Sequence, residues 1–183
     1  MIRFLDVVFS AVGLVLGSPL LAVLWGLGWW ETRSPLFRQV RLGRHQRPFV
    51  LVKFRTMRLD TDNVPTHMVS ASSVTPLGRF MRRTKLDELP QLWNVLRGDM
   101  SLVGPRPGLP SHAALTEARA RAGVFEARPG ITGLAQLRGI DMSTPETLAE
   151  ADARMLSDLS LADYFRYIVA TVFGGGQGDR VQR

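Results

Sequence analysis

The most apolar segment of the chain lies at its N-terminus. No charged residue occurs from Val7 to Trp30, and a helix of this length measures about 36 Å at about 1.5 Å per residue. Because the hydrocarbon core of a bilayer is about 30 Å thick, the pattern predicts a membrane helix. The segment ends in Trp25, Trp29 and Trp30, which is typical of a membrane interface and not of the small-residue cleavage site of a secretory signal.

Two features favour a helix that enters the membrane and returns to the same face. Ser18 and Pro19 lie at the midpoint, where proline removes a backbone donor and a bend is expected, while the serine hydroxyl can bond to a freed carbonyl. Arginines flank the segment on both sides, which favours a cytoplasmic position for both of its ends. They are Arg3 before the segment and Arg33, Arg38, Arg41, Arg44 and Arg47 after it. A plain transmembrane anchor is the alternative.

Beyond this segment the pattern changes to short β-like runs and then to amphipathic helices. Phe37–Leu42 and Phe49–Phe54 predict a small β-hairpin around the turn-forming GRHQRP. Residues 110–126 and 145–173 predict helices, and PGITG at 129–133 predicts a turn. The apolar face of the last helix either packs in the core or docks at the membrane interface. It consists of Leu156, Leu159, Tyr164, Tyr167, Ile168, Val172 and Phe173.

The stretch TKLDELPQLWNVLRGDMSLVGPRP at 84–107 combines an apolar helical stripe with two adjacent acids. The stripe consists of Leu89, Leu92, Trp93 and Leu96. Gly98 is expected to end the helix. Since Pro90 is tolerated only in the first helical turn, the helix is expected to begin near Asp87, which places Asp87 and Glu88 at its N-terminus.

The composition limits the chemistry. The 183 residues include 23 Lys or Arg, 16 Asp or Glu and no cysteine, which gives a net charge of +7. A chain without cysteine has no disulfides, thiolate nucleophile or cysteine zinc site. The positive charge implies a polyanionic partner, namely nucleic acid, an anionic membrane surface or a phosphorylated substrate.

The acids at 87–88 allow two interpretations. An Asp at a helix N-terminus is a favoured cap, but capping needs only one acid. Basic residues on both sides favour a phosphate site, in which guanidinium groups bind phosphate oxygens and a divalent cation sits on the carboxylates. These basic residues are Arg79, Arg82, Arg83 and Lys85 before the pair and Arg97 and Arg106 after it.

Three motifs resemble those of the bacterial sugar transferases known as monotopic phosphoglycosyl transferases. They are KFRTM at 53–57, the run from Arg82 to Pro107, and PGITGLAQ at 129–136. The resemblance spans nearly the whole chain and includes the Ser-Pro break. The length matches the small members that consist only of the catalytic unit.

The resemblance implies a single domain at 1–183. Residues 1–30 are expected to form a re-entrant membrane helix. Residues 31–173 are expected to form a compact cytoplasmic catalytic unit, mainly α with a small β-hairpin and amphipathic interfacial helices. A flexible tail is expected at 174–183. The implied location is the cytoplasmic face of the bacterial inner membrane, in contact with its phospholipids.

The implied reaction is the transfer of a sugar-1-phosphate from a UDP-sugar to a polyprenol phosphate such as undecaprenyl phosphate, with release of UMP. In the family the Asp of the Asp-Glu pair attacks the β-phosphate and forms a covalent phosphosugar intermediate, which the lipid phosphate resolves. Asp87 occupies that position, and Glu88 is the second acid.

Cations are required because a carboxylate approaching a diphosphate meets repulsion of about 4 kcal/mol per charge pair at about 4 Å. Mg²⁺ is the expected cofactor, bridging Asp87 or Glu88 to the diphosphate. Lys53, Arg82 and Arg106 match basic positions of the family and are expected to hold phosphate. The other basic residues near the pair, Arg79, Arg83, Lys85 and Arg97, are expected to be solvated or to contact lipid headgroups.

Gln136 and Arg138 are further candidates, for contact with the nucleotide. The three histidines have no metal-ligand spacing and are expected at the surface; they are His45, His67 and His112.

Two other classes of protein remain. A membrane-tethered scaffold or partner-binding module explains the anchor and the basic surface, but it does not need the Asp-Glu pair. A nucleic-acid binder is disfavoured, because the basic residues lack an interleaved aromatic platform. The sugar, the polyprenol, the pathway and the oligomeric state, including a homo-oligomer, stay open.

Overall fold

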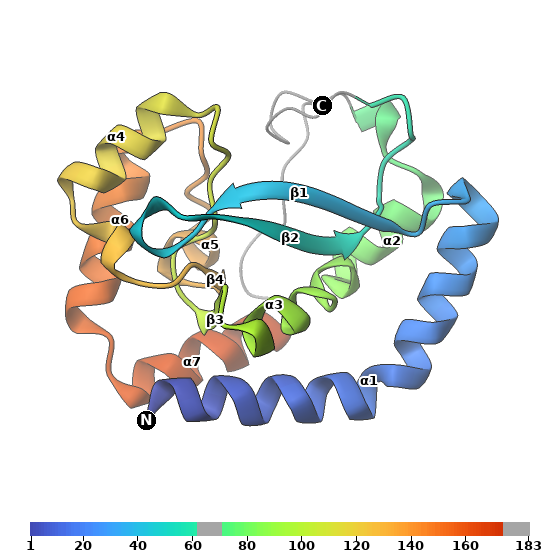
Figure 1. Ribbon diagram of the computed structural model, residues 1–183, viewed down its shortest axis with the longest axis horizontal. Coiled ribbons are helices and arrows are strands. Elements are labelled where there is room, and N and C mark those ends of the chain that lie inside the picture. The colour runs from blue at the N-terminus through green and yellow to red at the C-terminus, as the bar shows by residue number, and fades with distance from the viewer. Residues whose placement is uncertain (62–70, 174–183) are drawn as a thin grey trace.

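The computed structural model describes residues 1–61 and 71–173, in which helices surround two small sheets (Figure 1). The helices are α1 (Ile2–Thr32), α2 (Pro76–Thr84), α3 (Gln91–Arg97), α4 (Ala113–Arg121), α5 (Leu134–Arg138), α6 (Pro145–Asp158) and α7 (Leu161–Val172). The strands are β1 (Leu36–Leu42), β2 (Pro48–Phe54), β3 (Ser101–Val103) and β4 (Gly130–Thr132). Short 3₁₀ turns are η1 (Arg44–Gln46), η3 (Ala71–Ser73), η4 (Leu86–Glu88) and η5 (Val124–Glu126). The mainly helical prediction is confirmed; the tail expected at 174–183 lies outside the described residues.

Helix α1 covers the predicted apolar segment and bends near its middle (Figure 1). Pro19 lies inside the helix and has no N–H for the carbonyl of Val15, four residues earlier. The hydroxyl of Ser18 donates to that carbonyl at 2.8 Å. The expected back-bond from the serine is therefore present, and it satisfies the acceptor that the proline frees. In the described part of the chain, α1 is the one helix long and apolar enough to cross a membrane.

The predicted hairpin is confirmed. Strands β1 and β2 pair antiparallel, with Phe37 opposite Lys53. The two strands are joined by η1 within the predicted turn, where His45 has a left-handed backbone conformation (φ 54°).

The turn predicted at 129–133 is wrong, because this segment forms strand β4, which pairs in parallel with β3. The N–H of Ser101 donates to the Pro129 carbonyl at 2.8 Å, and the N–H of Gly104 donates to the Thr132 carbonyl at 2.8 Å. Glycine at position 130 allows the two strand backbones to come close together, because a Cβ on Gly130 would lie 2.0 Å from the Gly104 nitrogen.

The helix expected to begin near Asp87 is divided in two. Lys85 has a left-handed conformation (φ 58°) and ends α2, after which the chain forms η4. Helix α3 begins only at Gln91, after Pro90, whose nitrogen has no N–H to continue a hydrogen-bonded helix from the turn. Asp87 thus lies in a separate 3₁₀ turn and does not start the α-helix. Gly98 ends α3 as predicted (φ 94°).

Helix α3 packs against α1, and its buried residues include Gln91, Asn94 and Val95. Leu92 lies against Gly13 of α1. The side chain of Asn94 donates to the Val50 carbonyl at 2.7 Å and accepts from the Val52 N–H at 3.1 Å. These two bonds fix α3 to strand β2, because the buried side-chain amide of Asn94 finds its hydrogen-bond partners on the backbone of that strand.

The two helices predicted in the C-terminal half are each interrupted. Residues 110–126 form α4 and η5, and residues 145–173 form α6 and α7, which are separated at Leu159. Ser160 caps α7: its hydroxyl accepts from the Asp163 N–H at 3.1 Å. Tyr164 of the predicted apolar face is buried, whereas Phe173 is 85% exposed. Helix α5 was not predicted.

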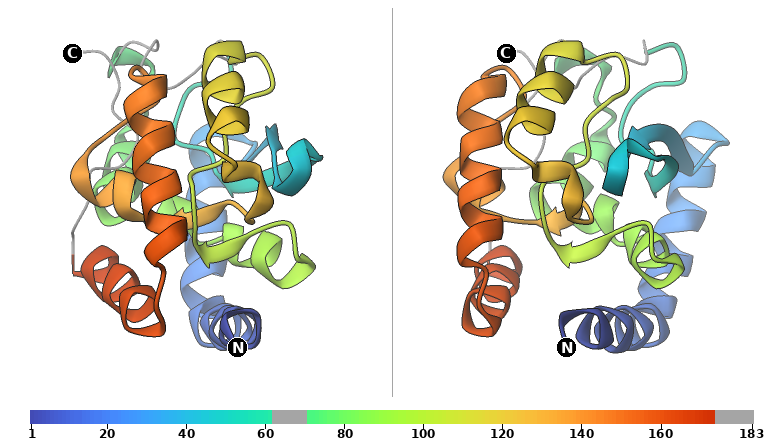
Figure 2. Two further views of the ribbon diagram at one scale, coloured as in Figure 1. Left: turned by 90° about the vertical axis from the view of Figure 1, so that its left-hand side faces the viewer. Right: turned by 60° about the vertical axis from the view of Figure 1, so that its left-hand side comes forward.

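Figure 2 shows α4 beside α6, with α7 at the same end of the molecule as the first half of α1. Phe9 of α1 and Phe165 of α7 are in edge contact there, with ring centroids 6.0 Å apart. At the other half of α1, Leu24 packs with Phe54 of β2 and Met81 of α2. The N-terminal helix is therefore packed against the rest of the molecule along both of its halves.

Candidate functional site

The adjacent acids lie on η4, a turn fixed by the elements around it. Leu86 packs in the cluster formed by Phe54 and Met81, and η4 contacts both β2 and α2. The turn is closed by a bond from the Glu88 N–H to the Lys85 carbonyl at 3.2 Å. This anchoring leaves the Asp87 residue only 6% exposed. A side chain on such a turn has little freedom to move.

Glu88 forms an ion pair with Arg106. Nη2 of Arg106 lies 2.8 Å from Oε1 of Glu88, and the two side chains are 23% and 13% exposed. An ion pair in such a sheltered place is screened less by water than a surface pair. The structure thus joins Glu88 to the guanidinium between Pro105 and Pro107.

Lys85 lies close to this pair, which differs from the solvated or headgroup position expected for it. It is half-buried, and burial is the main cause that lowers its pKa. The charge of Glu88 raises the same pKa and that of Arg106 lowers it, which places all three groups within electrostatic reach. Its left-handed backbone conformation (φ 58°) is not revealed by any side-chain pattern.

Helix α2 links the KFRTM motif to the turn that carries the acids. Arg82 donates from Nε to the hydroxyl of Thr56 at 2.8 Å, so the last turn of α2 is bonded to the segment after β2. Lys53 on β2 is buried, with Nζ 5.7 Å from the centre of the Phe37 ring. Thr56 was not among the predicted residues, although its place in the motif could have suggested it.

Gln136 and Arg138 both lie on α5. The side-chain amide of Gln136 is buried, and neither its oxygen nor its nitrogen has a hydrogen-bond partner. Arg138 is exposed. Among the residues that the structure describes, neither is bonded to Glu88, so their contact with a nucleotide stays a prediction.

The remaining basic residues near the pair are exposed as expected; they are Arg79, Arg83 and Arg97. Of the histidines, His45 is exposed beside Glu126, at 3.6 Å. His112 is half-buried at the start of α4, which differs from the surface position expected for it. His67 lies outside the described residues.

The carboxylates at 87–88 suit one kind of metal. Within residues 1–61 and 71–173, no group of three or more His, Asp or Glu side chains could hold an ion. A closed metal cage built by the protein alone is thus not found in that part of the chain. Mg²⁺ is usually held by one or two carboxylates together with substrate phosphates, so Asp87 and Glu88 would be the residues to hold such an ion.

Comparison with known proteins identifies the family of the chain. The model of the family described as bacterial sugar transferase matches residues 1–176. The chain is 44% identical over 162 residues to the UDP-glucose:undecaprenyl-phosphate glucose-1-phosphate transferase of Caulobacter vibrioides. The matched region covers 86% of the chain and 60% of that protein. It is 38% identical over 184 residues to a transferase of the same name from Klebsiella pneumoniae, over 94% of the chain and 39% of that protein.

A third relative, from Bacillus subtilis, is named a putative undecaprenyl-phosphate N-acetylgalactosaminyl 1-phosphate transferase and is 42% identical over 111 residues, or 59% of the chain and 62% of that protein. The chain thus spans less than two thirds of each of these relatives. Since the family model covers nearly its whole length, the chain belongs to the bacterial sugar transferase family.

Proposed function

We propose that this protein transfers a sugar-1-phosphate from a UDP-sugar to undecaprenyl phosphate, giving undecaprenyl-diphosphate-sugar and UMP. The relatives carry names for this type of transfer with glucose, and one with N-acetylgalactosamine. The observation that carries the proposal is the sheltered Glu88–Arg106 pair beside the buried Asp87. A tether or scaffold does not need this arrangement.

The proposed reaction has two halves. A carboxylate oxygen of Asp87 bonds to the β-phosphorus of the UDP-sugar while the bond from that phosphorus to the bridging oxygen breaks, and UMP leaves with that oxygen. A phosphate oxygen of undecaprenyl phosphate then bonds to the same phosphorus, and the carboxylate of Asp87 is released. Each half moves one phosphosugar group and needs no oxidant or reductant.

The basic side chains make the attack of one anion on another possible. Arg106 is expected to hold a phosphate oxygen while keeping Glu88 in place, and Lys53 and Arg82 are expected to hold the diphosphate from the β2 and α2 side. Mg²⁺, when bound to the acids and the diphosphate, would neutralise charge on the leaving group. Its binding is part of the proposal.

The proposal includes a re-entrant course for α1, with both ends at the cytoplasmic face. Near the first end, Arg3 donates to the carbonyls of Leu96 and Met100 at 3.2 and 3.3 Å. Near the other end, Glu31 accepts from the N–H of Leu77 at 3.2 Å. Because both ends bond to the same folded unit, a straight crossing would have to break one set of these contacts.

Asp6 strengthens the first of these attachments. Its carboxylate is buried and accepts from the Leu102 N–H at 3.0 Å, the Ser101 hydroxyl at 3.1 Å and the Tyr164 hydroxyl at 2.9 Å. Burial and the neighbouring Asp6 raise the pKa of Tyr164, so its hydroxyl stays protonated and donates. A buried carboxylate with three donors resists separation, because each donor would lose its partner.

The helices beside the first half of α1 expose several large apolar side chains, which suits a membrane interface. Trp93 of α3 is 54% exposed, and Phe165 and Val169 of α7 are also exposed. These helices contact α1 or lie beside it (Figure 2). Amphipathic helices that lie in the interface bury such side chains in the lipid boundary. On this view Asp87 and the lipid phosphate meet at the cytoplasmic surface of the membrane.

The function is tested with purified protein, Mg²⁺, undecaprenyl phosphate and a panel of UDP-sugars, by measuring UMP release and the lipid product. We expect sustained release with at least one sugar and only when the lipid phosphate is present. No release with any sugar, while the protein is folded and membrane-bound, would favour the alternative of a non-catalytic membrane scaffold.

A further inference from the structure

The Pro105–Gly108 segment carries Arg106 into the site, and every carbonyl along it is bonded to another element. The Pro105 carbonyl accepts from the Gly130 N–H at 2.8 Å, and the Gly108 carbonyl accepts from the Leu42 N–H at 3.0 Å. These two bonds fix the ends of the segment on β4 and β1. The two carbonyls between them are bonded by arginine side chains.

Arg41 and Arg119 supply these inner bonds. Nη1 of Arg41 donates to the Pro107 carbonyl at 3.1 Å, and Nη1 of Arg119 donates to the Arg106 carbonyl at 2.7 Å. Both arginines are buried, with exposed fractions of 8% and 2%. A hydrogen bond from a charged donor in a buried place is stronger than a neutral one. The backbone of the residue that contacts Glu88 is thus held directly by a second guanidinium.

Arg119 is itself fixed by Asp152 of α6. Nε and Nη2 of Arg119 both donate to Oδ2 of Asp152, at 3.0 and 2.6 Å. The Asp152 side chain has no exposed area, and burial raises the pKa of its carboxyl against the opposing effect of Arg119. A buried ion pair is no strong argument for stability, because desolvation offsets much of its attraction. Positioning of Arg106 is a function that this pair can have apart from stability.

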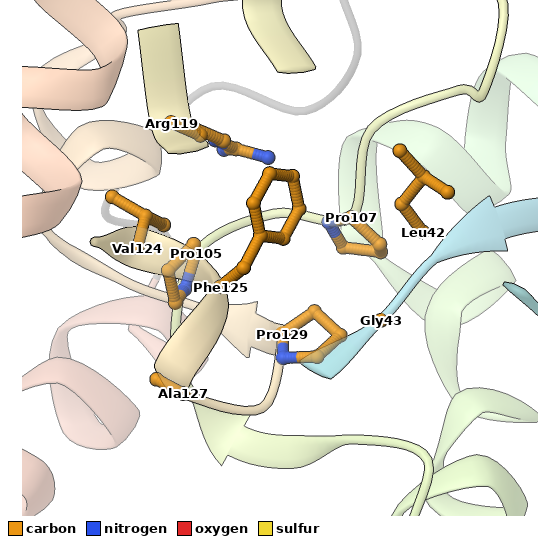
Figure 3. A pocket seen from close by; sticks show the side chains of 9 residues that line it. All are labelled: Leu42, Gly43, Pro105, Pro107, Arg119, Val124, Phe125, Ala127 and Pro129. Atoms are coloured by element: carbon orange, nitrogen blue, oxygen red, sulfur yellow. The ribbon is translucent and has the colours of Figure 1, made fainter. Parts of the chain in front are cut away.

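Figure 3 shows how the parts meet. Arg119 extends from α4 past the ring of Phe125 toward Pro107, and Pro105 lies on the other side of the ring. The space left between these residues is about 10 Å³, no more than one water molecule needs. The segment is therefore packed as well as hydrogen-bonded.

We propose that Arg119, held by Asp152, is a positioning residue that acts through the Arg106 carbonyl to keep the Arg106 guanidinium on Glu88. This inference rests on the proposed function, because its effect is read in the transfer reaction. Neither residue touches the acids, so the effect must pass through Arg106. A small displacement of a catalytic group costs a large factor in rate, so the carbonyl bond is expected to matter more for turnover than for stability.

The test is Arg119→Lys. Lysine keeps the charge opposite Asp152, but one nitrogen cannot stand at the positions of both Nη1 and Nη2, so the bond to the Arg106 carbonyl is expected to be lost. We expect kcat/KM for the UDP-sugar to fall by about tenfold to hundredfold, measured per folded molecule. Arg121→Lys is the matched control, because Arg121 pairs with Glu146 of α6 on the surface at 2.7 Å. It should keep wild-type activity.

A double-mutant cycle separates positioning from a general effect on the fold. In an Arg106→Lys background, Arg119→Lys should lower the rate of UMP formation by less than about threefold, since the group that Arg119 positions is already altered. An equal loss in both backgrounds, or wild-type activity of the single variant, would overturn the inference. If Arg119→Lys does not fold, the same two criteria apply to Asp152→Asn. Inactivity of the wild type would instead count against the proposed function.

Discussion

Glu88 and Arg106 come from different ends of one motif and meet in the folded chain. Lys85, just before the acids, and Gly98, between the two partners, have positive φ angles of 58° and 94°. Glycine adopts such an angle without strain, whereas a lysine there is uncommon. The strained position of Lys85 lies two residues before the proposed nucleophile, where strain is often functional.

The pair at 88 and 106 leads to a prediction for Glu88→Gln. The variant keeps the size of the side chain but removes the charge that faces Arg106, so we expect the rate of transfer to fall by about 10²- to 10³-fold. The measurement is the initial rate of UMP release at saturating UDP-sugar. Glu126→Gln is the control, because that acid is exposed and lies beside His45. A rate within about threefold of the wild type would show that the charge of Glu88 is not needed.

Among the elements, α1 and the β1–β2 hairpin were the most predictable. A long uncharged run and two β-like runs around a turn are local patterns, and both were found close to their expected bounds. Strands β3 and β4 were missed because each is too short to show alternation, and the glycine that allows their close contact also signals a turn. The break before α3 was missed because the conformation of Lys85 depends on packing around η4.

The re-entrant course of α1 predicts a labelling pattern. Single cysteines at Ile2 and at Glu150 of the otherwise cysteine-free chain should both stay unlabelled by an impermeant maleimide in intact cells. Both should be labelled once the inner membrane is opened. Labelling of the residue 2 cysteine from outside would show that α1 crosses the membrane.

The bend is tested in the same experiment with Pro19→Ala, which restores an N–H to the Val15 carbonyl and permits a straight helix. This change should move the residue 2 cysteine toward labelling from outside, while Leu20→Ala, which keeps the proline, should not. Equal protection in both variants would show that the contacts of Arg3 and Asp6, and not the proline, hold the first end of α1.

At the scale of the whole molecule, the candidate site draws its residues from positions 53–106 and its support from other elements. Asp87, Glu88 and Arg106 were predictable from one long motif together with its resemblance to the family. The hydrogen bonds that hold the Arg106 segment were not predictable, since Arg41, Arg119 and Asp152 lie outside the motif, on β1, α4 and α6. The tertiary fold alone brings these side chains to the Arg106 loop.

The central claim is that Asp87 carries the phosphosugar between two substrates, one soluble and one in the membrane. The most direct measurement is the intact mass of the protein after incubation with an accepted UDP-sugar and Mg²⁺ but without undecaprenyl phosphate. We expect a gain equal to one sugar phosphate, an equivalent release of UMP, and loss of the adduct when the lipid is added. Asp87→Asn should form no adduct, whereas Asp158→Asn, at an exposed acid of α6, should form it normally. An adduct on the Asp87→Asn protein would contradict the account, as would a wild type that turns over with lipid but never gains mass without it.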